Sequence, residues 1–149
     1  MKKKVPSLLT HRVDLKPAFQ DLDIMNVVWH GRYWQFIETA RHALFQKIGY
    51  GYPEMIATGY QYPIVQADIK YIRPITLEQD FYILADLLEF ENRIKIQFRF
   101  YDSRTDQLLC QASSTQVAMI TGDQHLQFMT PACWQDKVRS ILEENAHEI

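Results

Sequence analysis

The sequence predicts an α+β fold in which one long helix packs against an antiparallel sheet and a second helix ends the chain. Between His30 and Ile48, apolar residues recur every three or four positions, which is the spacing of one helix face. From about residue 65 to residue 115, apolar and polar side chains alternate, which is typical of half-buried strands. Because these strands follow one another through short turns, antiparallel pairing is expected, with the helix against the sheet's apolar face.

Composition sets the size and class of the protein. A chain of 149 residues, 47% hydrophobic and 23% charged, can bury one core and needs no second, so residues 1–149 are interpreted as one domain. A net charge of −2 gives no reason to expect a nucleic-acid partner. Cys110 and Cys133 fit neither a disulfide framework nor a metal-finger spacing, which favours a reducing, cytoplasmic setting.

The first half of the chain contains the long helix. Residues 1–9 carry a run of three lysines and an apolar piece too short for a secretory core or a membrane span, so we expect a flexible terminus and no membrane insertion. A strand is expected near residues 10–19. The helix from His30 to Ile48 should end at Gly49, and a short helical turn is expected over Pro53–Thr58.

The second half is expected to contain four or five consecutive strands and the last helix. A strand over Val65–Tyr71 should stop at Arg73-Pro74, and residues 80–90 form the next strand. Ile94–Phe100 is the clearest strand, with alternate residues apolar. The strand from Leu108 has one row that becomes small at Ala112 and Ser114, which suits close packing by another element. Thr130-Pro131 is a helix start, and the helix is expected to run to about Glu144.

One segment resembles a known family. Asp21-Leu22-Asp23, Val27-Val28-Trp29-His30, Tyr33 with Phe36, and Glu38-Thr39-Ala40-Arg41 resemble the signature of the 4-hydroxybenzoyl-CoA thioesterase family, which includes the YbgC-like acyl-CoA thioesterases. The likeness continues through Asp68-x-x-Tyr71-x-Arg73-Pro74 and covers roughly residues 10–120. The resemblance implies a hotdog fold, a curved antiparallel sheet wrapped around one central helix, in a homodimer or homotetramer.

The resemblance also implies a reaction and its residues. The reaction is hydrolysis of an acyl-CoA or acyl carrier protein thioester, with no cofactor and no metal. The family's catalytic carboxylate falls on Asp23, and its oxyanion-binding backbone N–H falls on His30. The residues expected to line the substrate pocket are Val27, Val28, Trp29, Tyr33 and Glu38.

Elementary chemistry supports the two catalytic assignments. A free N–H at a helix start carries partial positive charge and can stabilise the oxyanion that forms when a thioester carbonyl is attacked. A carboxylate beside apolar residues can take a proton from water or attack directly, and the sequence leaves both open for Asp23.

Several residues in this segment also have purely structural readings. An aspartate before a helix is commonly a turn former, and this is the reading we adopt for Asp21. The His30 imidazole either orients a carboxylate or water, or satisfies a polar neighbour. For Glu38, an ion pair with Arg41 or His42 is favoured over a catalytic role, and aromatic residues at helical spacing are usually core.

Two rival functions remain at this stage. The first is an acyl-thioester binding protein without hydrolytic activity, which is favoured by Met25 and Asn26 where the family usually has small residues. The second is a hydroxyacyl-thioester dehydratase, for which we would expect a histidine in a glycine-rich segment. The stretch Asp21–His30 fits the dehydratase less well.

Overall fold

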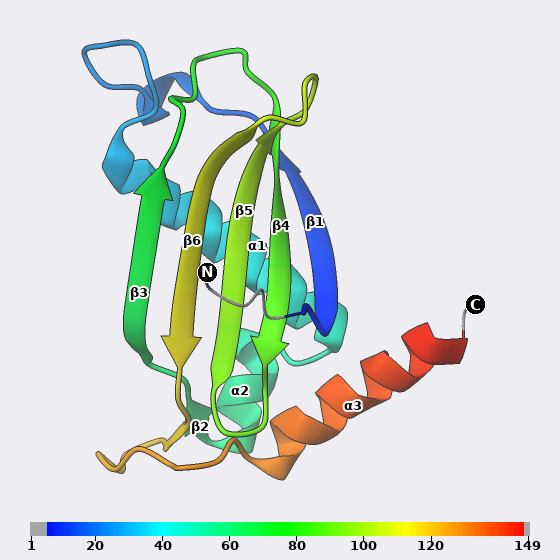
Figure 1. The fold of residues 1–149 in the computed structure, drawn as a ribbon. Helices are drawn as coiled ribbons and strands as arrows, with labels where there is room; N and C mark the ends of the chain where they lie inside the picture. Colours follow the sequence, from blue (N-terminus) through cyan, green and yellow to red (C-terminus); the bar gives the residue numbers. More distant parts are fainter. Residues whose placement is uncertain (1–5, 148–149) are drawn as a thin grey trace, which may run out of the picture.

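The computed structural model describes residues 6–147, and Figure 1 shows how the helices and strands are arranged. The lysine run and most of the expected flexible terminus therefore lie outside the described residues. Strand β1 (Leu9–Leu15) begins inside that expected terminus, because Leu9 is buried against the core and the Leu8 N–H bonds the Leu87 carbonyl at 2.8 Å. The strand is also shorter than expected, ending at Leu15 instead of near residue 19.

The main sheet has five strands in the order β1-β4-β5-β6-β3, and every neighbouring pair is antiparallel. The four later strands are β3 (Ile64–Tyr71), β4 (Phe81–Glu89), β5 (Ile94–Asp102) and β6 (Leu108–Gln116). Their bounds lie within two residues of those predicted from alternation. Since β3 is last in the order, one of its edges has no neighbouring strand within residues 6–147.

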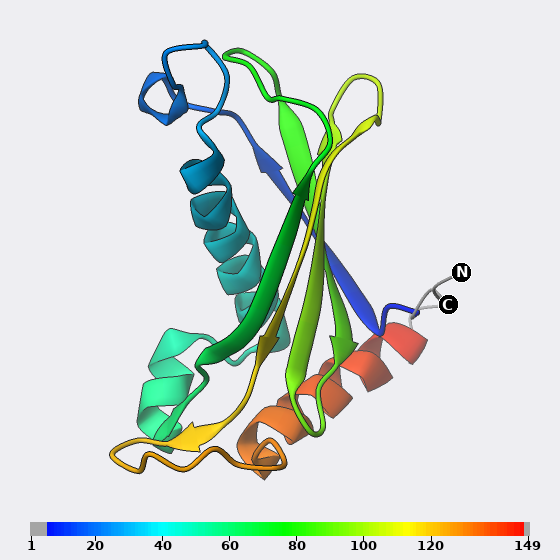
Figure 2. The ribbon, with the colours of Figure 1, turned by 60° about the vertical axis from the view of Figure 1, so that its left-hand side comes forward.

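Helix α1 (Tyr33–Ile48) crosses the inner face of the sheet, as Figures 1 and 2 show. A 3₁₀ turn over His30–Arg32 leads into it, so the predicted helix is present with a tighter first turn. Its buried side includes Ile37 and Leu44, and Gly49 ends it in the left-handed conformation, φ 87°. Glycine adopts this conformation without steric cost. The expected α+β arrangement is confirmed.

The other end of the molecule holds the smaller elements. Helix α2 (Tyr52–Thr58) leads into a two-stranded sheet of β2 (Tyr60–Gln61) and β7 (Met119–Ile120), which the sequence did not predict because strands of two residues have no periodicity. Helix α3 (Ala132–His147) begins beside them and runs outward (Figure 2). It is anchored by Trp134, which is fully buried and donates its indole N–H to the Phe90 carbonyl at 2.9 Å.

The burial of β3 differs from the prediction. Its apolar row, Val65 to Tyr71, was expected to lie on a dry face, yet Val65 is 51% exposed and Tyr71 is 46% exposed. The direction of the row is correct, since Ala67 and Ile69 are register partners of the inward-facing Ser114 and Ala112. The row is uncovered because α1 packs mainly against β1 and β4, which lie at the opposite edge of the sheet from β3.

Candidate active site

The segment Leu22–Val28 forms a tight reversal at one end of the molecule. Leu22 and Val28 form an antiparallel bridge, and within it the Asp23 N–H bonds the Val27 carbonyl at 2.9 Å. The Asn26 N–H then bonds the Asp23 carbonyl at 3.1 Å, with Asn26 at φ 62°. Asparagine tolerates this left-handed conformation better than most residues. Asp23 is thus fixed at the base of the reversal.

The Asp23 carboxylate is half-buried and only partly engaged. Its Oδ1 accepts the Met25 N–H at 2.8 Å, an arrangement that stabilises the turn. Among the described residues, no donor bonds its Oδ2. The turn-forming role and a free carboxylate oxygen are therefore present together in one residue.

Asp21 has the structural role predicted for it. Its side chain is buried, and Oδ2 accepts the Ala18 N–H at 2.8 Å. Its backbone carbonyl accepts the Trp29 N–H at 2.8 Å, which ties the two ends of the reversal together. The Arg32 guanidinium lies 3.9 Å from Oδ1 and balances the charge.

His30 opens the 3₁₀ turn, and its backbone N–H bonds no acceptor within residues 6–147. The residues around it are held firmly, because Val28 donates to Ile75 at 2.7 Å and Arg32 donates to the Trp29 carbonyl at 2.8 Å. A free N–H at this position points away from the turn and carries the positive end of the helix dipole. The imidazole is exposed, and its ring lies 5.3 Å from that of Trp29.

The five residues expected to line a pocket are divided between core and surface. Val28 and Tyr33 are 4% and 3% exposed and belong to the hydrophobic core. Val27 is half-buried, and Trp29 is 47% exposed. The Trp29 ring lies across Gly31, where a Cβ atom would come within 2.5 Å of it, so any larger residue at that position would require the ring to move.

Glu38 forms the ion pair with Arg41 that its spacing favoured. The Arg41 side chain is 1% exposed and also donates to the Ser114 hydroxyl at 2.7 Å. Tyr52 donates its hydroxyl to the second oxygen of Glu38 at 3.3 Å. The carboxylate of Glu38 is therefore engaged at both oxygens and lies two turns along α1 from His30.

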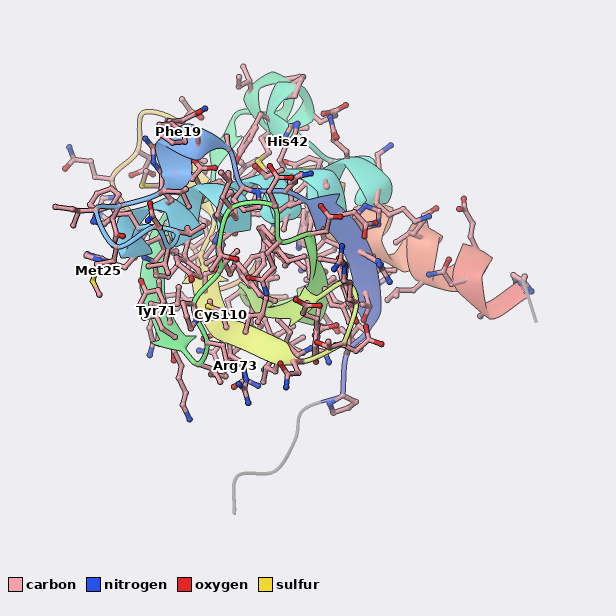
Figure 3. The ribbon with its side chains drawn as sticks, turned by 90° about the horizontal axis from the view of Figure 1, so that it is seen from above. Phe19, Met25, His42, Tyr71, Arg73 and Cys110 are labelled. Atoms are coloured by element: carbon pink, nitrogen blue, oxygen red, sulfur yellow. The ribbon has the colours of Figure 1, made fainter. Side chains whose placement is uncertain are left out.

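Tyr71 is a residue of this region that the sequence did not select as a site residue. It ends β3, and its hydroxyl donates to the His30 carbonyl at 3.1 Å. Figure 3 shows Tyr71 and Met25 on the same side of the molecule. Its place in the Asp68-to-Pro74 part of the family signature was the only signal, and that signal indicated a strand end, not a contact with the helix start.

Burial affects the ionisation of two groups on the inner face close to this end. It raises the pKa of Tyr33 to about 12 and the pKa of the Cys110 thiol to about 12. Both groups are therefore neutral at physiological pH, and Cys110 is a fully buried thiol. Neither group can act as a base or nucleophile in this state.

The remaining clusters and cavities point elsewhere. In the described part of the chain, no three His, Cys, Asp or Glu side chains are grouped so as to hold a metal ion. No helix there is long and apolar enough to cross a membrane. A cavity of about 500 Å³ lies between α2 and α3, lined by residues such as Tyr50, Thr58 and Cys133. It lies at the end of the molecule that holds α2, opposite to the end where the chain enters α1 (Figure 1).

Comparison with known proteins gives the family. Residues 17–120 match the model of the thioesterase-like superfamily. The chain belongs to this superfamily. The match includes Asp23, His30, all of α1 and the strands β3 to β6, so the family signature and the geometry described above concern the same residues.

Solved structures confirm the hotdog fold. The 1,4-dihydroxy-2-naphthoyl-CoA thioesterase Slr0204 of Synechocystis superposes with a TM-score of 0.79 at 17% identity, covering 89% of this chain and 97% of that one. The 4-hydroxybenzoyl-CoA thioesterase of Pseudomonas sp. strain CBS-3 gives 0.75 at 17% identity, covering 86% and 98%. At these identities the likeness concerns the fold.

Two relatives are similar in sequence. A Synechocystis protein named as a candidate esterase, sll0410, is 28% identical over 110 residues, which are 74% of this chain and 61% of that protein. YneP of Bacillus subtilis, named as a candidate acyl-CoA thioesterase, is 29% identical over 62 residues, 42% of this chain and 45% of YneP. The chain thus aligns with less than two thirds of the length of each.

Proposed function

We propose that the protein hydrolyses acyl thioesters of coenzyme A or of acyl carrier protein, with Asp23 as base or nucleophile and the His30 N–H as oxyanion donor. The observation that carries this proposal is that two free polar groups lie close in sequence, one within the hydrogen-bonded reversal Leu22–Val28 and one at the start of the 3₁₀ turn that follows it. Asp23 Oδ2 and the His30 N–H have no partner within residues 6–147, while the backbone around both is hydrogen-bonded. Family membership and the names of the relatives agree with this chemistry.

The reaction can be written with Asp23 as a base. The carboxylate takes a proton from water, and the resulting hydroxide adds to the thioester carbonyl. Negative charge then moves to the carbonyl oxygen, which the His30 N–H stabilises by a hydrogen bond strengthened by the helix dipole. The intermediate collapses, the carbon–sulfur bond breaks, and the thiolate takes the proton.

A nucleophilic route uses the same two groups. The carboxylate adds to the thioester carbonyl and expels the thiolate, which leaves an anhydride between Asp23 and the acyl group. Water then hydrolyses the anhydride and restores the carboxylate. Both routes need Asp23 ionised and the N–H free, so one substitution tests them together.

The test is Asp23→Asn with Asp14→Asn as its matched control. Asp14 is an exposed carboxylate on β1 whose partner is Arg12, so its loss removes the same charge away from the site. We expect Asp23→Asn to lower turnover by about 10²–10⁴-fold, the range typical of a lost acid–base group, and Asp14→Asn to leave it unchanged. Release of free thiol from aliphatic, aromatic and carrier-linked thioesters measures this. Equal hydrolysis by both variants would reject the assignment.

One observation favours the non-hydrolytic alternative. Asp23 Oδ1 already accepts the Met25 N–H, so the carboxylate has a structural use that a binding protein would also need. Such a protein would be stabilised against heat by a thioester without releasing thiol. The same substrate panel, followed by both thermal unfolding and thiol release, separates the two functions.

We also propose that the protein is a homo-oligomer, with a dimer as the minimum, joined at β3. This strand has a free edge and an uncovered apolar row. Loops also project beyond β3 at both ends of the molecule (Figure 1). Each loop carries an exposed apolar residue: Ile24, 98% exposed, lies in the loop before α1, and Phe128, 97% exposed, lies in the loop before α3. A two-fold axis at β3 would bring the end near Asp23 against the opposite end of the second copy.

The oligomer is tested by Ile69→Lys. This change puts a charge into the apolar row, and Gln66→Lys puts the same charge on the opposite face of the same strand. Sedimentation should give a compact monomer for Ile69→Lys, and the wild-type assembly for Gln66→Lys. A wild-type protein that sediments as a monomer would contradict the proposal.

A further inference from the structure

Tyr71 connects the free edge of the sheet to the start of α1. It is the last residue of β3, where its register partner is Cys110 of β6, and its hydroxyl donates to the His30 carbonyl at 3.1 Å. Its ring meets the ring of Tyr33 edge-on, with centroids 4.9 Å apart at 85°. Since Tyr33 is buried in the core, the Tyr71 ring rests on a fixed neighbour.

The hydroxyl of Tyr71 completes a set of bonds that fix both peptide groups of His30. On the N-terminal side, the Trp29 carbonyl accepts the Arg32 N–H at 2.8 Å. On the C-terminal side, the His30 carbonyl accepts the Tyr33 N–H, and the Tyr71 hydroxyl adds a second donor from outside the helix. A 3₁₀ turn has poorer hydrogen-bond geometry than an α-helix, so an outside donor has more influence here.

The tyrosine can act only as a donor in this contact. Burial, and then the neighbouring Cys110 thiol, raises the pKa of Tyr71 above its ordinary value, so the hydroxyl keeps its proton at neutral pH. A carbonyl has no proton to offer in return. The direction of the bond is therefore fixed.

We infer that Tyr71 is a positioning residue for the oxyanion donor: its hydroxyl holds the His30 carbonyl and thereby stabilises the 3₁₀ turn that directs the His30 N–H. The inference rests on the proposed function, because it assigns Tyr71 to the same N–H. The N–H and the carbonyl of His30 belong to the two peptide groups joined at its Cα atom, and both groups take part in the hydrogen bonds of one 3₁₀ turn, so a bond that stabilises this turn helps to hold the N–H in place. Rate depends steeply on the placement of such donors.

The experiment is Tyr71→Phe, which removes the hydroxyl and keeps the ring. Its control is Tyr82→Phe, which removes a hydroxyl bonded to Asp106 at 2.7 Å on another part of the sheet. We expect kcat of Tyr71→Phe to fall about five- to tenfold, the effect of one lost hydrogen bond, with KM changed less than about twofold. Tyr82→Phe should match the wild type in both. A kcat for Tyr71→Phe equal to that of the control overturns the inference.

A second measurement does not need activity. The residual dipolar coupling of the His30 N–H bond reports the direction of that bond, and the carbonyl ¹³C shift of His30 reports its hydrogen bonds. Both should change in Tyr71→Phe and stay as in the wild type in Tyr82→Phe. If the wild-type chain hydrolyses no thioester, the proposed function fails by itself. Unchanged His30 signals in Tyr71→Phe would then overturn this inference separately.

Discussion

Strands β5 and β3 have the same alternating pattern of apolar and polar residues, but their inward rows differ in burial. In β5 the inward residues are fully buried, and in β3 the corresponding row is largely exposed. The difference comes from position, because β5 is central in the sheet and β3 is at its edge, away from α1. Alternation therefore shows which side of a strand is apolar, and leaves open what covers that side.

The uncovered side of β3 is also where the candidate site lies. The strand ends at Tyr71, whose hydroxyl reaches the His30 carbonyl, and the reversal that holds Asp23 projects at the same end of the molecule (Figure 1). The central strands are buried in the core, and under the proposals above the edge strand supplies a surface for a second copy and, through Tyr71, a contact with the oxyanion donor.

The largest effect is expected from a cavity in the central strand. Ile96 is fully buried, with Leu87 and Ser114 as its register partners. Ile96→Ala should lower the free energy of unfolding by about 2–5 kcal/mol, at any protein concentration. Ile69→Ala in β3 should cost less than about 1 kcal/mol at low protein concentration, because its side chain is only partly buried within one copy. Urea unfolding at several protein concentrations measures both.

If the two alanine variants lost the same free energy of unfolding at low protein concentration, the proposed difference between β5 and β3 would be wrong. That result would mean that Ile69 belongs to the core of a single copy as fully as Ile96 does. A loss for Ile69→Ala that grows with protein concentration would instead support the proposed assembly at β3.

The free energy of unfolding is expected to fall at alkaline pH because of two buried groups, Cys110 and Tyr33, near the boundary between the buried central strands and the exposed strand β3. Cys110 lies between Phe100 of β5 and Tyr71 of β3, and burial raises its pKa from 9.0 to about 12. Burial also raises the pKa of Tyr33 from 10.0 to about 12. The unfolded chain releases these protons first, so stability should be constant below about pH 9 and fall as the pH rises toward 12, by about 1.4 kcal/mol per pH unit for each group.

Unfolding free energies from about pH 8 to about pH 10.5 check this dependence. In Cys110→Ala the decline should begin about one pH unit later, because only tyrosine ionisation remains below pH 12 in that region. A wild-type protein whose stability stays level through this range would show that the inner face at Cys110 is open to water.

Long regular patterns made most of the fold predictable. The helix from His30 and the strands from residue 65 to residue 115 repeat their spacing often enough to identify face and element. The pair β2 and β7 could not be predicted, since each strand has two residues and their pairing depends on the chain around them. The exposure of β3 could not be predicted either, because it depends on where α1 lies across the sheet.

The candidate site was predictable where it is local in sequence. The Asp21 side-chain bond to Ala18 and the ion pair of Glu38 with Arg41 both join residues three apart. An aspartate before a helix indicated a turn-forming role for Asp21, and helical spacing indicated the ion pair of Glu38. The bond from Tyr71 to His30 joins residues 41 apart and depends on where β3 ends relative to the helix start. No periodicity carries that information. The roles of Asp23 and His30 came from the family resemblance and stay predictions.

The smallest effects should distinguish two adjacent serines on β6. Ser114 faces inward and accepts a hydrogen bond from Arg41, whose Nε has no partner within residues 6–147. Ser114→Ala would leave a second nitrogen of this buried guanidinium unpaired, so we expect a loss of about 1–3 kcal/mol. Ser113 faces outward and bonds Asp68, which is exposed to water, so Ser113→Ala should change stability by less than about 0.5 kcal/mol.

Thermal or urea unfolding of Ser114→Ala and Ser113→Ala measures this difference in stability. The two variants are matched, because each removes one hydroxyl oxygen from a serine of the same strand. If Ser113→Ala were the costlier change, the outer face would be the one that excludes water, and the assignment of α1 to the inner face of β6 would have to be reversed. If both were neutral, Arg41 would have found another acceptor. The buried Oε1 of Gln116, the next inward residue of β6 and itself without a partner among the described residues, is the nearest candidate in register.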